Sequence, residues 1–165
     1  MCNFRFDATR LAALIFAFLA GGAVAADDRD ALAGLKEGKI AYDIKEGDPK
    51  ALMSRLDVIE ETRQSLIAQG VKPHFILAFR GPATKLLQTD PEAMKPEHRA
   101  DAVKVAEKVR KMKAAEGIEG FEQCALAVKS QGTKADKVLP EIKVVGNGFI
   151  SLMAYQARGY AYIAP

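Results

Sequence analysis

The sequence of 165 residues contains no tryptophan, and only 7% of its residues are aromatic. Aromatic side chains build the cages that hold quaternary ammonium groups and the platforms that hold sugars, so this shortage argues against both ligands. A strong excess of one charge is also missing, because 24 basic and 21 acidic residues give a net charge of +3 at pH 7. Nucleic-acid-binding domains carry basic surfaces, so this balance argues against a nucleic-acid partner.

Beyond residue 25 the sequence lacks any apolar run of the ~20 residues that a membrane-spanning helix needs. Within the first 25 residues, Arg5 and Arg10 precede the apolar segment Leu11–Ala20, and a small-residue cleavage motif follows at Ala23–Ala25. This arrangement is typical of a secretory signal peptide. We therefore expect residues 1–25 to be removed, and the mature protein to be periplasmic or secreted without a membrane anchor.

Cysteine is scarce, with only Cys2 and Cys124 in the chain. Cys2 precedes the apolar segment of the leader, so it is not placed like a lipoprotein cysteine and is expected to leave with the leader. Cys124 then stands alone in an oxidising compartment, where an unpartnered thiol is free, reactive or bonded to another molecule. A buried cysteine that acts as a small hydrophobic residue is the alternative, and the sequence leaves both open.

Recognisable metal and cofactor motifs are missing as well. His74 falls inside an expected strand and His98 at an expected helix start, with no other His or Cys at metal-ligand spacing. Gly34–Lys39 departs from a phosphate-binding loop in its glycine spacing, and Gly146–Gly148 lacks the third glycine of a dinucleotide motif. We expect neither a metal nor a cofactor, and the sequence leaves open whether the protein is an enzyme.

The sequence does contain a regular alternation of apolar runs and helical repeats. Runs typical of strands occupy residues 39–44, 71–79, 121–124, 142–145 and 160–163, and helical patterns occupy residues 49–70, 83–87, 97–115, 125–130 and 149–157. This alternation predicts an α/β fold, with a small, mostly parallel sheet and helices on both faces. We assign residues 26–38 to an N-terminal arm and residues 39–165 to a single domain.

Cys124 is the main candidate for a functional residue. In a parallel α/β sheet, reactive groups gather beyond the carboxyl ends of the strands, and Cys124 closes an expected strand. The helix expected directly after it would present N–H groups that stabilise a thiolate. The apolar residues Ala125–Val128 act in the opposite direction, because apolar surroundings favour the neutral thiol. The sequence does not decide which effect is larger.

Arg80 and Asn147 are candidate supporting residues, because each follows an expected strand. Arg80 would supply positive charge to Cys124 if their strands are neighbours, and its alternative is a surface arginine in a loop. Asn147 would offer a side-chain amide to a bound anion, as a substrate-binding residue, and its alternative is a turn residue between two glycines.

Several segments in this order resemble the DsrE/DsrF-like (sulfur-relay) family, in its secreted or periplasmic branch. The segments are Ile40–Ile44, Arg80–Ala83, Cys124 at the end of the third strand, Leu139–Pro140 before Ile142–Val145, and Gly159–Ile163 with the final Pro165. The resemblance implies a flavodoxin-like or Rossmann-like domain that forms trimers or hexamers. It also implies that Cys124 carries sulfur as a persulfide and exchanges it with a donor or acceptor protein. Many relatives have His-Gly in place of Arg80-Gly81, and Gly-Asn in place of Ala125-Leu126.

Three functional hypotheses follow. The first is a periplasmic, sulfurtransferase-like sulfur carrier in which Cys124 holds sulfane sulfur as a persulfide and Arg80 supports its thiolate. The second is a non-catalytic oligomeric binding module in which Cys124 is structural. The third is a thiol-redox sensor in which Cys124 is oxidised or bridged to another subunit. The resemblance favours the first.

Overall fold

The computed structural model describes residues 27–90 and 94–165. The predicted signal peptide, with Cys2, lies outside these residues. The described part forms one sheet of five strands in the order β4-β3-β2-β1-β5, and every neighbouring pair is parallel. The strands are β1 (Glu37–Ile44), β2 (Lys72–Phe79), β3 (Ile118–Cys124), β4 (Lys143–Val145) and β5 (Ala161–Ile163). The α/β prediction is confirmed, and the sheet is fully rather than mostly parallel.

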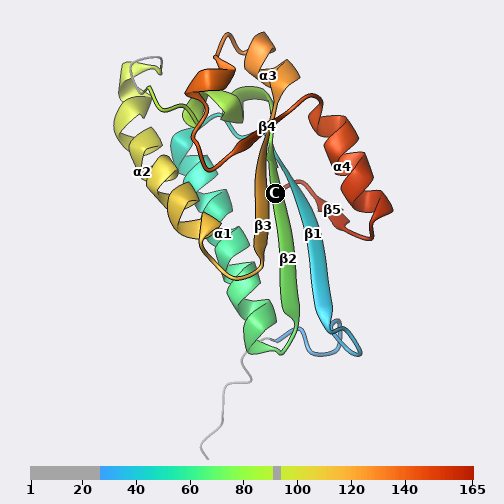
Figure 1. The fold of residues 1–165 in the computed structure, drawn as a ribbon. Coiled ribbons are helices and arrows are strands. Elements are labelled where there is room, and N and C mark those ends of the chain that lie inside the picture. Colours follow the sequence, from blue (N-terminus) through green and yellow to red (C-terminus); the bar gives the residue numbers. More distant parts are fainter. Residues whose placement is uncertain (1–26, 91–93) are drawn as a thin grey trace, which may run out of the picture.

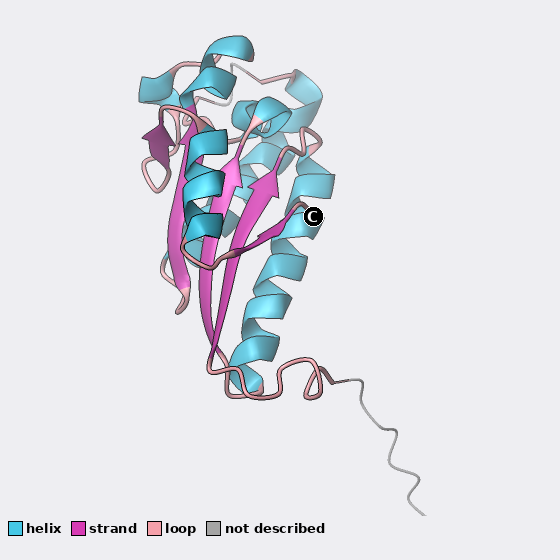
Figure 2. Ribbon diagram, turned by 90° about the vertical axis from the view of Figure 1, so that its right-hand side faces the viewer, coloured by secondary structure: helices cyan, strands magenta, loops and turns pink. Residues whose placement is uncertain are grey.

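Helices cover both faces of the sheet, as predicted. They are α1 (Pro49–Ala68), α2 (Pro96–Lys113), α3 (Ala125–Ser130) and α4 (Gly148–Ala157), with 3-10 turns η1 (Gly81–Leu86) and η3 (Ala135–Lys137). Figure 1 shows α1 and α2 on one face, α4 on the other, and α3 above the carboxyl ends of the central strands. Figure 2 looks onto the face that α4 crosses. The two faces are therefore covered unequally.

Local sequence signals set the start of α1. The Asp48 side chain accepts a hydrogen bond from the Ala51 N–H at 2.8 Å, and Pro49 occupies the first turn, where a missing N–H has no consequence. Leu52, Leu56 and other apolar residues at helical spacing are fully buried against the sheet. The predicted helix is confirmed because capping and periodicity agree.

Alternation along the strands divides the core into two unequal parts. Phe75, Leu77 and Phe79 of β2 point into the large core beneath α1 and α2. On the other face, Ala41 and Ala78 form a small core with Leu152 of α4. These small side chains let α4 approach the sheet closely and leave room for polar residues around them.

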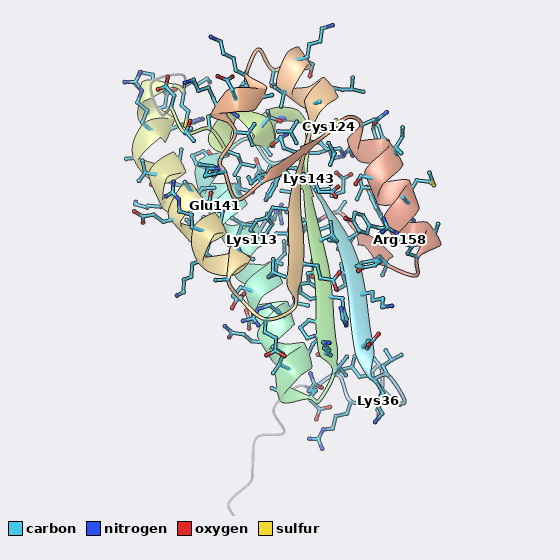
Figure 3. All side chains as sticks on the ribbon, in the orientation of Figure 1. Lys36, Lys113, Cys124, Glu141, Lys143 and Arg158 are labelled. Carbon is cyan, nitrogen blue, oxygen red and sulfur yellow. The ribbon has the colours of Figure 1, made fainter. Side chains whose placement is uncertain are left out.

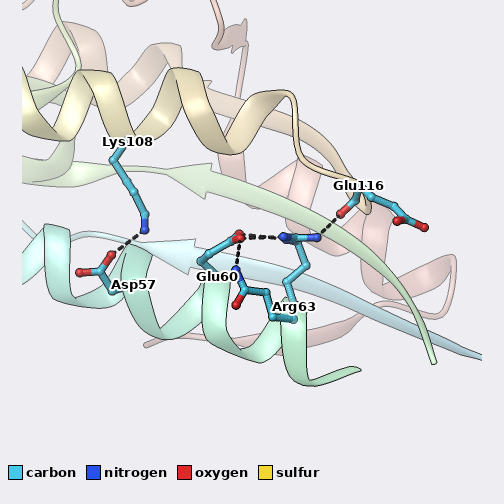
Figure 4. Close-up of polar contacts among 6 residues, drawn as sticks. Asp57, Glu60, Arg63, Lys108 and Glu116 are labelled. Atoms are coloured by element: carbon cyan, nitrogen blue, oxygen red, sulfur yellow. Dashed lines mark hydrogen bonds and ion pairs between the residues drawn. The ribbon is translucent and has the colours of Figure 1, made fainter. Parts of the chain in front are cut away.

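A polar cluster joins α1 to α2 and to the loop before β3 (Figure 4). Arg63 donates to both carboxylate oxygens of Glu60, at 2.9 and 2.6 Å, and to the backbone oxygen of Glu116 at 3.0 Å. Lys108 of α2 donates to Asp57 of α1 at 2.6 Å. Because Arg63 is buried, its link to the Glu116 backbone fixes the entry to β3.

Two strands extend beyond their predicted limits. β1 begins at Glu37, inside the segment assigned to the arm, because Glu37 pairs with Lys72 of β2. β3 begins at Ile118 rather than residue 121, since Ile118 pairs with Phe75. Gly120 resembles a turn signal in the sequence but lies inside β3, where it contacts Ile76. The predicted helix at 83–87 is the 3-10 turn η1.

Candidate functional site

The carboxyl ends of the strands bring the sequence-predicted site residues together on the α4 side of the sheet. We call Asp43, Arg80, Cys124, Asn147 and Gly148 the Cys124 site. Asp43 lies near the end of β1, Arg80 directly follows β2, Cys124 ends β3, and Asn147 and Gly148 begin α4. Figure 3 places Cys124 where the chain passes from β4 toward α4. The parallel topology assembles these residues from distant parts of the chain.

The sulfur of Cys124 faces the start of α4. Cys124 is 5% exposed, and its Sγ accepts a hydrogen bond from the Gly148 N–H, with an N···S distance of 3.3 Å. Gly148 is the first residue of the ten-residue helix α4, so the positive end of that helix is directed at the sulfur. The sequence had pointed to the helix directly after Cys124, but that helix, α3, makes no such bond to Sγ.

Gly148 fits because it has no side chain. A Cβ atom at this position would lie 2.7 Å from Cδ of Arg80 and 3.1 Å from Cβ of Cys124. Both distances are shorter than ordinary contacts, so a larger residue would push α4 away from the sulfur. From the sequence, Gly148 is interpreted as part of a turn. Its contact with Cys124 could not be predicted from a local sequence pattern, because the two residues are 24 positions apart.

Arg80 is held in place by the carboxylate of Asp43 and the ring of Phe149. Its Nε donates to Oδ1 of Asp43 at 2.8 Å, and its Nη2 donates to Oδ2 of the same carboxylate. Its guanidinium carbon lies 4.0 Å from the centre of the Phe149 ring. The Arg80 side chain is 11% exposed, so it is an inner residue of the site rather than a surface arginine. Tyr162 of β5 donates to Oδ2 of Asp43 at 2.7 Å and completes the cluster.

The charges of this cluster reinforce one another. Burial alone would raise the pKa of Asp43, but the hydrogen bonds from Arg80 and Tyr162 outweigh it and place the pKa below its usual value. The hydrogen bond to Asp43 raises the pKa of Arg80, and the charge of Cys124 adds a smaller contribution in the same direction. The bond to Asp43 also raises the pKa of Tyr162. At physiological pH the cluster therefore keeps the Arg80–Asp43 ion pair, with a neutral Tyr162 bonded to Asp43.

Asn147 caps α4. Its Oδ1 accepts a hydrogen bond from the Phe149 N–H at 3.0 Å, which satisfies one of the free N–H groups at the helix start. This cap fixes the first turn of α4 and thereby the direction of the Gly148 N–H. Asn147 thus lies beside the sulfur, with its carbonyl oxygen engaged in capping.

A second polar cluster, which sequence reasoning missed, fastens α4 to the sheet. Glu122 of β3 is 8% exposed and accepts hydrogen bonds from Ser151 and, at 2.8 Å, from Tyr155, both on α4. Tyr160, which follows α4, donates to Glu119 of β3. Burial, followed by the bond to the carboxylate, raises the pKa of Tyr155 and of Tyr160 to about 12. Both tyrosines therefore remain hydrogen-bond donors at physiological pH.

Within residues 27–90 and 94–165, no group of three or more His, Cys, Asp or Glu side chains has the arrangement of a metal site. Over the same residues, the helices are too short or too polar to span a bilayer.

Comparison with known proteins confirms the fold and assigns no activity. No family model matches the chain. An uncharacterised protein of Aquifex aeolicus is 23% identical over 125 residues, which cover 76% of this chain and 55% of that protein. The chain thus spans about half the length of that curated relative. The structure of a protein of unknown function from Methanobacterium thermoautotrophicum matches 78% of this chain and 99% of its own, with a TM-score of 0.55 and 19% identity.

Proposed function

We propose that this protein is a periplasmic sulfur carrier of the DsrE/DsrF-like kind, which holds sulfane sulfur as a persulfide on Cys124. The observation that carries the proposal is the bond from the Gly148 N–H to Cys124 Sγ, at the carboxyl edge of the sheet and next to the Arg80–Asp43 pair. The bond supports the proposal because an N–H group at the start of a helix stabilises negative charge on the sulfur that it faces.

Loading begins with attack of the Cys124 thiolate on a sulfane sulfur. With thiosulfate as donor, the thiolate attacks the outer sulfur and forms a new S–S bond. The S–S bond of thiosulfate breaks, and sulfite leaves with the bonding electron pair. Charge is conserved without an added oxidant or proton, because one thiolate is replaced by one persulfide anion.

Delivery repeats the exchange, with Cys124 as the leaving group. The thiolate of an acceptor protein attacks the terminal sulfur of the persulfide and takes it. Cys124 then leaves as a thiolate and is ready for another cycle. The Gly148 N–H stabilises Cys124 in both steps, because the anionic charge returns to the same place.

Arg80 positions the anionic donor in this proposal. Two of its N–H groups are used on Asp43, and an arginine side chain has five. Its remaining N–H groups and the side-chain amide of Asn147 offer donors to an oxyanion beside the sulfur. Because Asp43 and Phe149 fix the guanidinium, little motion is lost when the donor binds.

Access to the sulfur requires movement of α4. Cys124 is 5% exposed, so the first turn of α4, with Gly148 and Phe149, has to withdraw before a donor reaches Sγ. The small core under α4, formed by Ala41, Ala78 and Leu152, makes this helix easier to displace than α1 or α2.

Intact-protein mass spectrometry tests the proposal. Mature protein is measured before and after treatment with thiosulfate or polysulfide, with Cys124→Ser as the matched control. The expected result is a gain of one sulfur atom on the wild type only, which reductant removes. A wild-type thiol that gains no sulfur from any sulfane donor would rule out the carrier function.

The burial of Cys124 favours a second candidate, an oligomeric binding module in which the thiol fills space at the end of β3. In this case Cys124→Ala remains folded and functional, and the native thiol resists alkylation until the protein unfolds. The third hypothesis, a redox sensor bridged to another subunit, has less support because the sulfur is not at the surface. A dimer on non-reducing gels that disappears with reductant would favour the redox-sensor hypothesis.

Two further parts of the proposal concern location and assembly. A periplasmic location rests on the leader, and the N-terminal sequence of the exported protein tests whether cleavage follows Ala25. Self-association, as a trimer or hexamer by resemblance, is supported by Phe149, Ile150 and Met153, which are 64%, 61% and 58% exposed on α4. Such apolar residues clustered on one helix face are typical of a surface that another protein covers.

A further inference from the structure

A cavity of about 550 Å³ lies at the carboxyl edge of the sheet, on the side of α2 and α3. It is bounded by η1, by the start of α2 and by the segment 131–137. The lining includes no residue of the Cys124 site, so this is a separate feature. Pockets that hold small molecules have volumes of about 300–1,000 Å³, and in open α/β sheets they lie at this edge.

Backbone hydrogen bonds connect two walls of the cavity. The Thr89 N–H donates to the Lys137 carbonyl at 2.6 Å, and the Leu139 N–H donates to the Leu87 carbonyl at 2.9 Å. These bonds tie the segment after η1 to the segment after η3, beside the isolated bridge between Gln88 and Val138. The two walls are therefore held at a fixed spacing, as in a preformed site.

The lining of the cavity is strongly basic. Four lysines reach it from three segments of the chain: Lys85, Lys95, Lys134 and Lys137. His98 also lines it, and Asp90 is the one carboxylate among the lining residues of the described chain. None of the four lysines has a carboxylate within 4.0 Å in residues 27–90 and 94–165, whereas Lys108 on α2 is paired with Asp57. Like charges gathered around one hollow attract an anion with more than one charge.

The floor of the cavity is apolar. Leu86 and Met94 line it and are 2% and 8% exposed, and Pro82 lies at its margin. A hydrated inorganic ion would gain nothing from this surface, but an apolar or planar group would be removed from water there. The combination of a cationic rim and an apolar floor selects an organic anion.

We propose that this cavity binds a small organic oxyanion, with a phosphate-like dianionic group between the lysines and an apolar group against Leu86 and Met94. The inference stands apart from the sulfur-carrier function, because no residue of the Cys124 site takes part. Lysine binds such a group as a point charge, so several lysines from different segments suit a dianion without bidentate geometry.

Titration of ¹⁵N-labelled protein with phenyl phosphate, followed by NMR, tests the proposal. Phenyl phosphate carries both a dianion and an apolar ring. We expect saturable shifts in the amides of residues 85–90 and 131–137, weaker binding of inorganic phosphate, and no binding of benzyl alcohol. Inorganic phosphate that binds as tightly as phenyl phosphate would overturn the assignment to an organic ligand.

Two double variants with equal net charge distinguish binding in the cavity from non-specific electrostatic attraction to surface lysines. Lys134→Gln with Lys137→Gln removes two cavity lysines, and Lys36→Gln with Lys111→Gln removes two exposed lysines elsewhere. We expect the cavity variant to raise the Kd for phenyl phosphate about tenfold or more, and the control variant to change it less than about twofold. Equal weakening by both variants, or shifts spread over the whole surface, would overturn the proposal. So would the absence of saturable binding to the folded wild type.

Discussion

At the scale of single residues, the environment of the Cys124 sulfur depends on two neighbours with different physical roles. Gly148 supplies an N–H group and, through the absence of a side chain, the space for it. Asp43 does not contact the sulfur, but it holds Arg80 beside it through two hydrogen bonds. Gly148 acts through its small size and Asp43 through its charge, so the two roles can be tested separately.

Gly148→Ala tests the steric role. The new Cβ would lie 2.7 Å from Cδ of Arg80, whose guanidinium is pinned by Asp43 and so cannot move freely. We expect a loss of about 1–3 kcal/mol in the free energy of unfolding, as for overpacked sites. Urea denaturation measures this.

Gly146→Ala is the matched control, because a Cβ at Gly146 meets nothing within 4 Å. Its effect should stay within about 0.5 kcal/mol, as for other surface changes. Equal destabilisation by the two substitutions would contradict the close contact at Gly148.

Asp43→Asn tests the charge role through the pH dependence of stability. The pKa of Asp43 in the folded protein lies below its ordinary value of about 4. The ionised carboxylate therefore contributes fully to the free energy of unfolding above that ordinary pKa, and this contribution is lost as the pH falls through the lower pKa of the folded state. At pH 7 we expect Asp43→Asn to lower the free energy of unfolding by about 2 kcal/mol, because the hydrogen bonds from Arg80 and Tyr162 no longer have a charged acceptor. Urea denaturation at pH 7 and pH 3 should show that the free energies of unfolding of wild type and variant differ less at pH 3. A difference that is constant with pH would exclude the ion pair as its source.

At the scale of elements, α4 is the helix on which the site depends, and its attachment is more polar than that of the other helices. Its apolar contact with the sheet is the small cluster of Ala41, Ala78 and Leu152. Its polar attachments include the bonds from Ser151 and Tyr155 to Glu122, and its first turn contacts the Cys124 site through Gly148 and Phe149. A helix held in this way opens at a lower free energy than one seated in the main core.

Tyr155→Phe should therefore expose Cys124 more often. Loss of the hydrogen bond leaves an acceptor on buried Glu122 unsatisfied and weakens the attachment by about 1–2 kcal/mol. We expect the alkylation rate of Cys124 in the folded mature protein to rise about fivefold to thirtyfold if labelling follows the opening of α4.

Tyr42→Phe is the control, because Tyr42 is buried in the main core on the opposite face. It should destabilise the protein without a selective increase in Cys124 labelling under native conditions. Similar labelling rates in wild type and Tyr155→Phe would show that α4 does not govern access to the sulfur.

At the scale of the whole molecule, the large core is covered on the α1 and α2 side, while α4 leaves apolar side chains in solvent. Phe149, Ile150 and Met153 lie on adjacent turns of this helix and form its outer surface. Because this surface adjoins the start of α4, assembly would place a second copy of the chain near the Cys124 site. The proposed self-association and the proposed reactivity therefore meet at one helix.

Ile150→Glu tests whether this outer surface of α4 joins copies of the chain. A charge in the centre of an apolar interface is desolvated without a partner, so we expect the assembly to dissociate. Size-exclusion chromatography with light scattering measures the mass. Val103→Glu on α2 is the control, since Val103 is 46% exposed on the opposite side, and it should leave the mass unchanged. A wild-type protein that is already monomeric would contradict self-association.

Much of the fold follows from local patterns in the sequence. The cap at Asp48, the proline at 49 and the spacing of Leu52 and Leu56 are signals within one element, and they predict α1 correctly. The alternation of strands and helices likewise predicts the parallel sheet, because parallel neighbours require crossovers. That topology is also enough to place Cys124, Arg80 and Asn147 at one edge.

The contacts within the site were decided by the tertiary structure. The bond from Gly148 to Cys124 joins residues 24 apart, and the bond from Tyr162 to Asp43 joins residues 119 apart. The hydrophobic pattern of the sequence does not predict such pairs. They depend on the strand order and on how closely α4 approaches a face lined by Ala41 and Ala78. The sequence by itself therefore determined the elements and the edge where the chemistry belongs. Only the packing of α4 against the sheet decided which N–H reaches the sulfur and which carboxylate holds the arginine.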